Sequence, residues 1–570
     1  MVRTELGEVI MSLALPGGSL SRSKRLLLLS GLLCVGATFA NADIPSVGNL
    51  SPEEACKKIE GISIPASLIG LPTSGAGIKS TTMVMSSDEG NDNGDFCKVL
   101  GAIHPVTNNA PDINFEVNLP TKWNGKALQF GGGGFDGSLV TGLEHYRRQP
   151  ASEETPLARG YVTYGSDSGH QSSAPFDGRF FLNDEALRNY GHEQIKKTAD
   201  IARLLTKARY GRDAAFNYFI GASQGGHEAF DAAQRYADDY DGVVAAYPAH
   251  NLVMLHLSAN EYARALHAND GASWINPAKV ATFTKAVYTS CDSLDGAADG
   301  IISNVAVCRE ATAGFKLLNA ENPIRCEDGK DSGDDCLSDA QIQALIVMDT
   351  PLDIGFSIFP DDEGNSIFPK WTPFEGSTFF DGNFPNLGAD GPRQALQFMP
   401  GDATPRYAIA RDITLDTMND FDPKKWAGRI SDLAHLISAN SVNLDAFRRK
   451  GGKLIFFHGL VDDFIPPYSS IEYYKRLQKR YGQAALDDFV RFYTIPGMGH
   501  VTGPFAAYLP TLDRLEDWVE RGIAPGELTA VDTNEVTAGR TRPVCRYPAW
   551  PKYGGSGNLN EADSFKCVNQ

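Results

Sequence analysis

YFIGASQGGHEAF, residues 218–230, decides the fold of this chain. An apolar run ends in a glycine, and Ser223 follows among small residues at the start of a segment with helical spacing. The pattern G-x-S-x-G is typical of a tight turn from a buried strand into a helix, where only small neighbours fit. The segment therefore predicts a nucleophilic serine held at the end of a strand in an α/β protein.

Strand and helix patterns alternate on both sides of this turn. Helices are expected over residues 185–210 and near 470–481 and 504–521. The predicted strands are ALQF (127–130), YVTYGS (161–166), NYFIGAS (217–223), DGVVAAYPA (241–249), KLIFFHG (453–459) and FVRFYTI (489–495). Because strands that alternate with helices form parallel sheets, we predict an α/β fold with a doubly wound, mostly parallel sheet.

The sequence texture changes between residues 249 and 448, where aromatic, Gly, Pro, Asp and Asn residues replace the strand runs. A chain of 570 residues is too long for one simple core, so a catalytic domain with a large insertion is expected. We predict that residues 43–248 and 449–570 form the two parts of the α/β domain and that residues 249–448 form an inserted lid.

The N-terminus has the pattern of an export signal. The basic stretch SRSKR (21–25) precedes an apolar run over residues 26–40, and Ala40-Asn41-Ala42 is a small-x-small cleavage pattern. A membrane anchor is the alternative interpretation, but the run is short and is interrupted by Gly31 and Gly36. We predict a signal peptide over residues 1–42, a secreted or periplasmic mature protein, and no membrane association after cleavage.

Composition excludes one large class of partners. The formal net charge is −18, and no basic stripe is present that could bind phosphates, so the chain is not expected to bind nucleic acid. Hydrophobic content of 42% and charged content of 21% are those of a soluble globular protein.

Nine cysteines are present, and Cys34 lies in the predicted signal. An even number in an exported chain predicts disulfides, although eight cysteines allow about 105 pairings. Proximity in the sequence favours Cys56–Cys97, Cys291–Cys308, Cys326–Cys336 and Cys545–Cys567. Their spacing does not suggest a zinc site.

A serine nucleophile needs an imidazole to accept its proton and a carboxylate to orient that imidazole. Asp462 and Asp463 follow the strand KLIFFHG, and His500 follows the strand FVRFYTI in the loop PGMGH. The order serine, acid, histidine at three strand ends is the order found in α/β enzymes of this type. Ser223, His500 and one of the two aspartates are therefore the candidate catalytic residues.

Attack on an ester carbonyl builds negative charge on its oxygen, which backbone N–H groups can stabilise. We expect one donor to be the amide of Gln224, directly after the nucleophile. The second donor is expected in the glycine run at residues 131–134, with Gly132 and Gly133 as the candidates, because glycines let the backbone approach substrate closely.

Three aspartates, Asp292, Asp295 and Asp299, are interleaved with glycines in CDSLDGAADGII (291–302). Neighbouring carboxylates repel one another unless a hard cation neutralises them, and oxygen ligands favour Ca²⁺. Solvent-exposed Asp-Gly turns are the alternative, and the spacing alone does not decide between the two.

The chain as a whole resembles the tannase and feruloyl esterase family of α/β hydrolases, which includes enzymes that hydrolyse mono(2-hydroxyethyl) terephthalate. The stretches that carry the resemblance are the serine turn, GGGGFDGSL, GYVTYGSDSGHQ, NDEALRNYGHEQI, CDSLDGAADGII, HGLVDDFIPPYSSIEYY and PGMGH. The resemblance implies an α/β-hydrolase fold with Ser223 as nucleophile, Asp462 rather than Asp463 as acid, and His500 as base.

The resemblance also implies a structural Ca²⁺ in the lid, bound by Asp292, Asp295, Asp299 and the carbonyls of Ala297 and Ile301. One departure is clear. Many members carry a disulfide between a Cys before the nucleophile and a Cys after the catalytic histidine, where this chain has Ala222 and Val501. We therefore expect packing and hydrogen bonds alone to hold these loops, and activity to be insensitive to reductant at the site.

These patterns predict a secreted serine esterase that cleaves feruloyl, galloyl or terephthaloyl esters through an acyl-enzyme. The lid aromatics could flank an aryl ring or form the lid core, and a lid arginine could bind a substrate carboxylate. The aromatics are Trp371, Phe374, Phe379, Phe380, Phe384 and Phe398, and the arginines are Arg393, Arg406 and Arg411. A peptidase or thioesterase and a non-catalytic calcium-dependent binding protein are the alternatives. The alcohol of the ester and the oligomeric state stay open.

Overall fold

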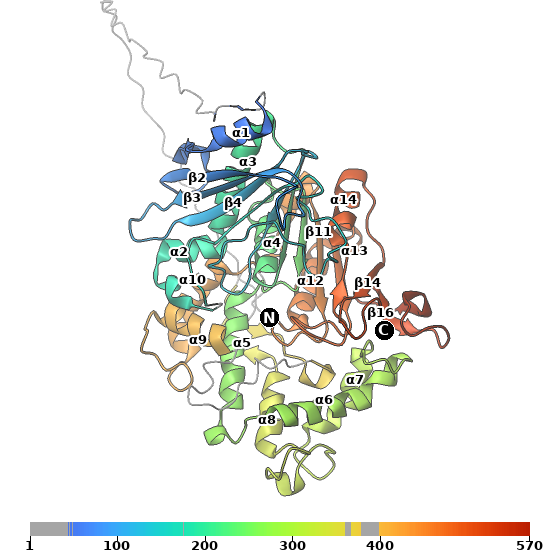
Figure 1. Cartoon of the computed structure of the whole chain (residues 1–570). Coiled ribbons are helices and arrows are strands. Elements are labelled where there is room, and N and C mark those ends of the chain that lie inside the picture. The colour runs from blue at the N-terminus through green and yellow to red at the C-terminus, as the bar shows by residue number, and fades with distance from the viewer. Residues whose placement is uncertain are drawn as a thin grey trace, which may run out of the picture. The chain divides into compact units, whose positions relative to one another are not determined.

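The computed structural model describes residues 44–569 except 45, 48–49, 175, 360–365 and 378–397, and this part contains a ten-stranded sheet (Figure 1). In sheet order the strands are β1 (Ser63–Ile64), β2 (Gly75–Val84), β3 (Phe96–His104), β4 (Ile113–Pro120), β6 (Val162–Ser166), β5 (Lys126–Phe130), β7 (Phe216–Ala222), β8 (Gly242–Ala246), β11 (Lys453–Gly459) and β12 (Val490–Ile495). Strands β6 to β12 pair in parallel, which confirms the predicted sheet, and β1 to β4 add an antiparallel edge.

Both faces of the parallel strands are buried, which explains their continuous apolar runs. Successive side chains point to opposite faces, so Phe219 and Val243 lie in one core while Tyr218 and Val244 lie in another. The first core includes side chains of α3 (Gln194–Tyr210), α4 (Gln224–Gln234) and α12 (Pro467–Tyr481), and the second includes those of α14 (Thr511–Arg521).

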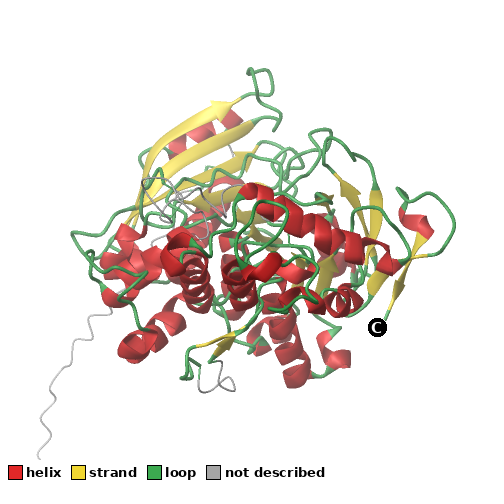
Figure 2. Ribbon diagram, turned by 90° about the horizontal axis from the view of Figure 1, so that it is seen from below, coloured by secondary structure: helices red, strands yellow, loops and turns green. Residues whose placement is uncertain are grey.

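The predicted insertion, residues 249–448, is mainly helical in its described part. In Figure 2, which views the molecule from the side of the insertion, helices lie in front of the sheet. Its helices are α5 (Leu252–Leu266), α6 (Pro277–Cys291), α7 (Val305–Ala311), α8 (Asp339–Met348), α9 (Phe398–Ala403) and α10 (Ala427–Ile437). They build a third core that also takes in Phe135 and Ile465 from the α/β part. Contacts join Ile44–Gln570 into one unit, so the boundaries at 248/249 and 448/449 stay predictions.

Several elements were not predicted. The antiparallel strands β2 to β4 were missed, and the helix expected near 504–521 begins only at Thr511, after the short strand β13 (Ala507–Tyr508). Strands β14 (Leu528–Asp532) and β15 (Thr541–Val544) pair with β13, and β16 (Trp550–Tyr553) pairs with β17 (Phe565–Val568). The helix over 185–210 is divided into α2 (Asp184–Arg188), a π-turn and α3.

The four predicted disulfides are confirmed: Cys56–Cys97, Cys291–Cys308, Cys326–Cys336 and Cys545–Cys567. The predicted signal peptide, including Cys34, lies outside the described residues. Among the residues that are described, the structure has no helix with the length and apolar character needed to cross a membrane.

Candidate active site

Ser223 occupies the turn between β7 and α4, as the sequence predicts. Its backbone has φ of 61° and ψ of −118°, a strained conformation that non-glycine residues rarely adopt. The chain passes so close to itself that a Cβ on Gly221 would lie 2.1 Å from the Gly225 carbonyl oxygen, and one on Gly225 would lie 2.8 Å from that of Gly132. Glycine is therefore required at both positions, which holds the serine at the end of the strand.

Three side chains that are distant in the sequence meet at this turn. The Nε2 atom of His500 lies 3.1 Å from Ser223 Oγ, and its Nδ1 atom lies 3.0 Å from Asp462 Oδ2. Asp462 is fully buried at the end of β11, and His500 is 8% exposed in the loop after β12. The imidazole is hydrogen-bonded to Asp462, so the geometry agrees with the choice of Asp462 as the acid.

The carboxylate of Asp462 is held in its charged form. Burial by itself would raise its pKa, but the charge of His500 and hydrogen bonds from His458 and His500 outweigh burial and hold the pKa well below its usual range. The amides of Phe464 and Ile465 donate to Oδ1 at 2.9 and 2.8 Å. Because both oxygens of Asp462 are hydrogen-bonded, the carboxylate can orient His500 and stabilise its protonated form.

The glycine run corrects one prediction. The Gly132 amide donates to Glu228 Oε2 at 2.9 Å, so its hydrogen is not available to an oxyanion. A Cβ on Gly132 would also lie 2.1 Å from Asp136 Oδ1. The close approach of this carboxylate, and not that of a substrate, therefore explains why glycine is needed here. Gly134, in the same run, borders the cavity beside Ser223 together with Gln224. The roles of Gln224 and Gly133 as donors stay predictions.

Two buried carboxyl groups, Asp136 and Glu228, lie behind this run. Ser168 Oγ donates to Asp136 at 2.8 Å, and Gln194 Nε2 donates to Glu228 at 2.8 Å. Burial raises the pKa of Asp136 to about 7, and burial together with the charge of Asp136 raises that of Glu228 well above its usual range. Because the charge of Asp136 disfavours ionisation of Glu228, one proton is retained between them near neutral pH.

This pair makes stability depend on pH, and Asp136→Asn should weaken the dependence. A carboxyl pKa that is higher in the folded state stabilises the fold at pH 4 and loses that contribution as pH rises through about 7. Asparagine has no charge to lose, keeps an acceptor for Ser168 and tolerates the positive φ of 58° at this position. Thermal unfolding should show a melting temperature raised by a few degrees at pH 8 and little changed at pH 5. An equal shift at both pH values would contradict the shared proton.

The cavity that borders Ser223 is small and mainly apolar. Its volume is about 20 Å³, and its walls include Phe176, Leu252, Leu255, Pro400, Phe464 and Ile465. Substrate entry therefore needs displacement of part of this wall. Arg406 is engaged by Asp402 and Arg411 by Asp184, so neither guanidinium is placed to hold a substrate carboxylate in this arrangement.

The lid aromatics that are described lie in cores. Trp371 and Phe374 are buried in the core of the insertion, and Phe398 packs with Ala263. Phe379, Phe380, Phe384 and Arg393 lie outside the described residues.

The loop that carries His500 is held by a hydrogen bond at Val501, one of the two positions where this chain lacks the cysteines of many relatives. Ala222 and Val501 flank the serine and the histidine, and Arg148 Nη2 donates to the Val501 carbonyl oxygen at 2.6 Å. The neighbouring Arg147 lies over the Tyr247 ring, which packs edge-to-face with the His500 ring at a distance of 4.8 Å between ring centres. The two arginines thus brace the histidine loop from the segment after β5.

Replacing Arg148 with alanine should lower kcat by about three- to tenfold, the effect of one lost hydrogen bond, because His500 is then less well positioned. KM should change little, since Arg148 does not border the cavity beside Ser223. Steady-state kinetics of Arg148→Ala and of the control Arg179→Ala, which removes an exposed arginine paired with Asp177, would measure this. Equal kinetics of the two variants would show that the brace has no catalytic effect.

The acidic loop of the insertion is held by hydrogen bonds and by the C-terminal region. Asp292 accepts from the Gly300 amide at 2.8 Å, and Asp295 accepts from the amides of Ala297 and Ser303 at 3.0 Å each. Asp299 pairs with Arg542, and its carbonyl accepts from Arg540. Burial raises the pKa of Asp295 to about 6, with the charge of Asp299 acting in the same direction.

The predicted calcium ligands do not form a ready-made ligand set. Among the described residues, no three His, Cys, Asp or Glu side chains are grouped so that they could hold a metal ion. The three aspartates nevertheless share one short loop, and burial disfavours the ionised form of Asp292 and Asp295. The calcium site therefore stays a prediction, which rests on the oxygen donors that these residues offer.

Comparison with known proteins places this chain in a family. The model of the family described as tannase and feruloyl esterase matches residues 97–568, which is most of the chain. The chain belongs to the tannase and feruloyl esterase family. Members of this family are esterases, and the protein is accordingly a carboxylic ester hydrolase.

Two relatives cover nearly the whole length of this family member. An uncharacterized esterase of Agrobacterium fabrum is 37% identical over 528 residues, which cover 90% of this chain and 93% of the relative. Mono(2-hydroxyethyl) terephthalate hydrolase of Piscinibacter sakaiensis is 30% identical over 530 residues, with coverage of 83% and 85%. The crystal structure of feruloyl esterase B from Aspergillus oryzae, at 23% identity, covers 87% of this chain and 98% of its own with a TM-score of 0.69. The predicted α/β-hydrolase fold is confirmed.

Sequence reasoning missed two features of this esterase site. Glu228 and Asp136 both stand in the quoted motifs, but nothing in their spacing shows that a strand-end loop and a helix would bring two carboxyl groups together. Arg148 lies in a segment without strand or helix pattern, 353 residues from its partner Val501. No local pattern in the sequence singles this arginine out.

Proposed function

We propose that this esterase is a secreted serine hydrolase that cleaves esters of aromatic acids through an acyl-enzyme. The observation that carries the proposal is the continuous hydrogen-bonded line from Ser223 through His500 to Asp462 at the end of parallel strands. Nucleophile, base and orienting acid stand within hydrogen-bond distance in the order that acyl transfer requires.

In this mechanism Ser223 Oγ attacks the ester carbonyl while His500 Nε2 accepts its proton. The resulting oxyanion is stabilised by the amide of Gln224 and by a backbone N–H of the glycine run, with Gly133 or Gly134 in place of Gly132. His500 then gives the proton to the leaving alcohol, which leaves an acyl group on Ser223. Water activated by the same imidazole releases the acid, and Asp462 keeps the imidazole oriented throughout.

The apolar walls beside Ser223 favour an aromatic or other apolar acyl group over a charged one. The sequence relatives named for feruloyl and terephthalate esters support the same substrate class. A panel of hydroxycinnamate, gallate and terephthalate esters, compared with acetate and butyrate esters, would test it. Rapid mixing with the best aryl ester should show a burst of alcohol equal to the enzyme concentration when deacylation is slow. Preference for the short aliphatic esters would overturn the aromatic class.

Two alternatives use the same scaffold. A peptidase or thioesterase would use the same triad, so matched aryl amides and thioesters belong in the panel, and faster turnover of either would favour that class. A non-catalytic calcium-dependent binding protein would show no labelling by a fluorophosphonate probe. The hydrogen-bonded arrangement of Ser223, His500 and Asp462 favours an enzyme over a non-catalytic binding protein.

We also propose that a structural Ca²⁺ binds the acidic loop of the lid. Asp292, Asp295 and Asp299 would supply carboxylates, and Ala297 and Ile301 would supply carbonyls. The support is the chemistry of the donors, three carboxylates and two carbonyls on one short loop. The ion lies outside the proposed reaction and would fix the loop against Arg540 and Arg542.

Removing calcium should lower the melting temperature by several degrees, because an ion that binds only the folded loop stabilises it by mass action. Thermal unfolding in excess chelator, with and without added Ca²⁺, measures the shift. Asp295→Asn is the matched control and should respond less to calcium. Identical melting curves with and without chelator, in protein that contains no calcium by elemental analysis, would contradict the proposed calcium site.

Secretion is proposed from the basic and apolar pattern of residues 1–42, and the four disulfides agree with an oxidising compartment. N-terminal sequencing of the protein recovered from periplasm and medium should find Asp43 as the first residue. An intact Met1 in the exported protein would contradict cleavage after Ala42.

A further inference from the structure

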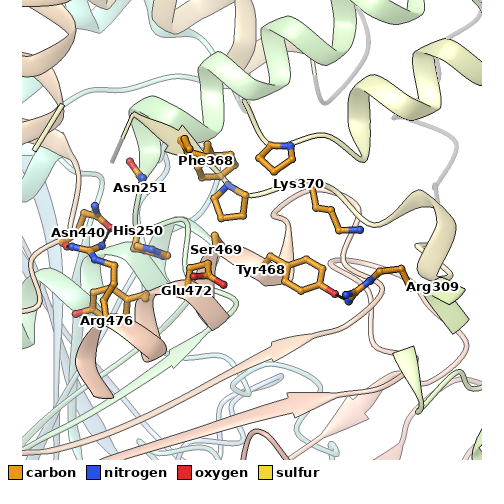
Figure 3. Close-up of a pocket in the computed structure, with 14 residues that line it drawn as sticks. His250, Asn251, Arg309, Phe368, Lys370, Asn440, Tyr468, Ser469, Glu472 and Arg476 are labelled. Carbon is orange, nitrogen blue, oxygen red and sulfur yellow. Dashed lines mark hydrogen bonds between the residues drawn. The ribbon is translucent and has the colours of Figure 1, made fainter. Parts of the chain in front are cut away.

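Residues at and before the start of α5 border two cavities. His250 and Asn251, directly before the helix, line a cavity of about 470 Å³ beside the first turn of α12 (Figure 3). No residue of the triad lines this cavity, and its cation Lys370 is already paired with Glu375. The other is the small cavity beside Ser223, which the helix itself borders. This small cavity adjoins the proposed reaction, so its polar lining atoms can decide which ester reacts.

One face of α5 forms a wall of the small cavity. Its lining residues recur at the spacing of a helix face and are Leu252, Leu255, His256 and Ala259. The side chain of Gln224, which also lines the cavity, is already engaged, because Tyr190 donates to its Oε1 at 3.2 Å and His227 Nδ1 lies 3.3 Å from its Nε2. Among the described lining residues, this leaves Ser223 and His256 as the polar side chains for a substrate to contact.

Thr404 determines where the single ring proton of His256 lies. Thr404 Oγ1 is 2.8 Å from His256 Nδ1, and the two residues are 0% and 4% exposed. The hydroxyl has no other hydrogen-bond partner among the described residues, and a buried hydroxyl without an acceptor is costly, so its hydrogen points to Nδ1. Burial lowers the pKa of His256 to about 3, so the ring is neutral at pH 7. A neutral imidazole that accepts at Nδ1 carries its proton on Nε2.

The Nε2–H group of His256 is open to the small cavity. In the described part of the chain Nε2 has no hydrogen-bond partner, but it keeps accessible surface, unlike the enclosed Oγ1 of Thr198. Because His256 lines the cavity, a ligand there can reach this surface. The ring packs edge-to-face with Phe135 at 5.4 Å between ring centres, so Thr404 and Phe135 hold its orientation. His256 therefore presents a fixed, neutral donor beside the nucleophile.

The small cavity suits a neutral ligand. Among the described residues that line it, none carries a charged side chain. The lid arginines Arg406 and Arg411 are paired with Asp402 and Asp184. A carboxylate placed in the cavity would lose its water without meeting a cation, which is unfavourable, whereas a hydroxyl or ether oxygen would gain a hydrogen bond from His256 Nε2.

We propose that His256 is a specificity-determining residue, whose Nε2–H donates a hydrogen bond to a hydroxyl or methoxy oxygen on the aromatic ring of the acyl group. The ring lies against the apolar side chains of the cavity, after part of the wall has moved to admit it. This role rests on the proposed ester hydrolysis at Ser223 and narrows its substrates to esters of aromatic acids with a neutral oxygen substituent. Half-esters of terephthalic acid, whose ring carries a carboxylate, are disfavoured.

The selectivity of a His256→Phe variant tests the proposal, because phenylalanine keeps a ring against Phe135 but has no donor. The measurement is kcat/KM for the methyl esters of cinnamate, 3-hydroxycinnamate and 4-hydroxycinnamate at pH 7, where the phenols are neutral. The ratio of at least one hydroxy ester to the cinnamate ester should fall by about three- to tenfold relative to the native protein. Comparing this ratio between the two proteins cancels the electronic effect of the hydroxyl and any loss of folded protein. An unchanged ratio for both hydroxy esters overturns the proposal.

His267→Phe is the matched control. His267 lies at the C-terminal end of the same helix, stacks on Trp274 with ring centres 5.4 Å apart and does not line the small cavity. This variant should keep the native ratio. A ratio that falls equally in His267→Phe and His256→Phe would show that the cavity donor does not set the selectivity, and would overturn the proposal.

Thr404 variants test the position of the ring proton. Thr404→Val removes the hydroxyl that donates to Nδ1 and should lower the same ratio by about two- to threefold, because the proton is then free to move to Nδ1. Thr404→Ser keeps the hydroxyl and should retain the native ratio. If the two variants share one ratio, Thr404 does not fix the proton and the assigned donor is overturned.

The charge preference is measured on the native protein with a matched pair of esters. Monomethyl terephthalate should be cleaved with a lower kcat/KM than methyl benzoate, whose ring lacks the carboxylate. The reverse order would overturn the preference for a neutral ring while leaving the proposed ester hydrolysis intact. A native protein that cleaves none of these aryl esters would contradict the proposed function itself, and this role of His256 with it.

Discussion

Replacing Ser223 with alanine should lower kcat/KM for an aryl ester by about a million-fold. The loss is large because His500 and Asp462 act only through the serine hydroxyl, so the remaining catalysis comes from binding and oxyanion stabilisation alone. Steady-state kinetics and labelling by a fluorophosphonate probe measure the effect, and the native protein should be labelled once per chain while Ser223→Ala is not labelled.

The matched control is Ser290→Ala in the insertion, where the hydroxyl donates to the Ala286 carbonyl of its own helix at 3.0 Å. It should retain native activity and labelling. Labelling that persists in Ser223→Ala would assign the nucleophile to another residue and would remove the proposed mechanism while leaving the fold and the family unchanged.

The second large effect is expected from Asp462→Asn, which should lower kcat by about ten-thousand-fold. An asparagine amide cannot stabilise the imidazolium, and its nitrogen facing His500 Nδ1 would favour the wrong tautomer. Asp463→Asn is the control at the adjacent position, and it should lower kcat by no more than about threefold because His500 Nδ1 is already bonded to Asp462. Kinetics at a fixed saturating substrate concentration compare the two. The opposite ranking would mean that Asp463 is the functional acid.

The parallel strands and the triad could be predicted because they follow from local patterns and from chain order. KLIFFHG forms β11 over the predicted residues, and the loops after β11 and β12 hold Asp462 and His500. Parallel strands end at one edge of the sheet, so residues that follow them converge even when hundreds of positions separate them. Each of the four disulfides joins two cysteines that follow one another along the chain, so the order of the cysteines was enough to predict the pairing.

The features that were missed depend on packing between distant segments. Strands β2 to β4 contain glycine and polar residues at an edge, so their runs lack the continuous apolar character of the central strands. Gly132 fits the glycine pattern of an oxyanion loop, yet its amide is bound by Glu228. The sequence shows that a glycine is needed at this position, but not which group approaches it.

The order in which the chain is made has a bearing on the acidic loop near residue 300. Its counter-charges are Arg540 and Arg542, and the contact with Arg542 spans 243 residues of sequence. A nascent chain therefore cannot complete this loop until almost all of it has been synthesised. A chain that ends before residue 540 would lack both arginines, so the contacts that hold this loop form only when synthesis is nearly complete.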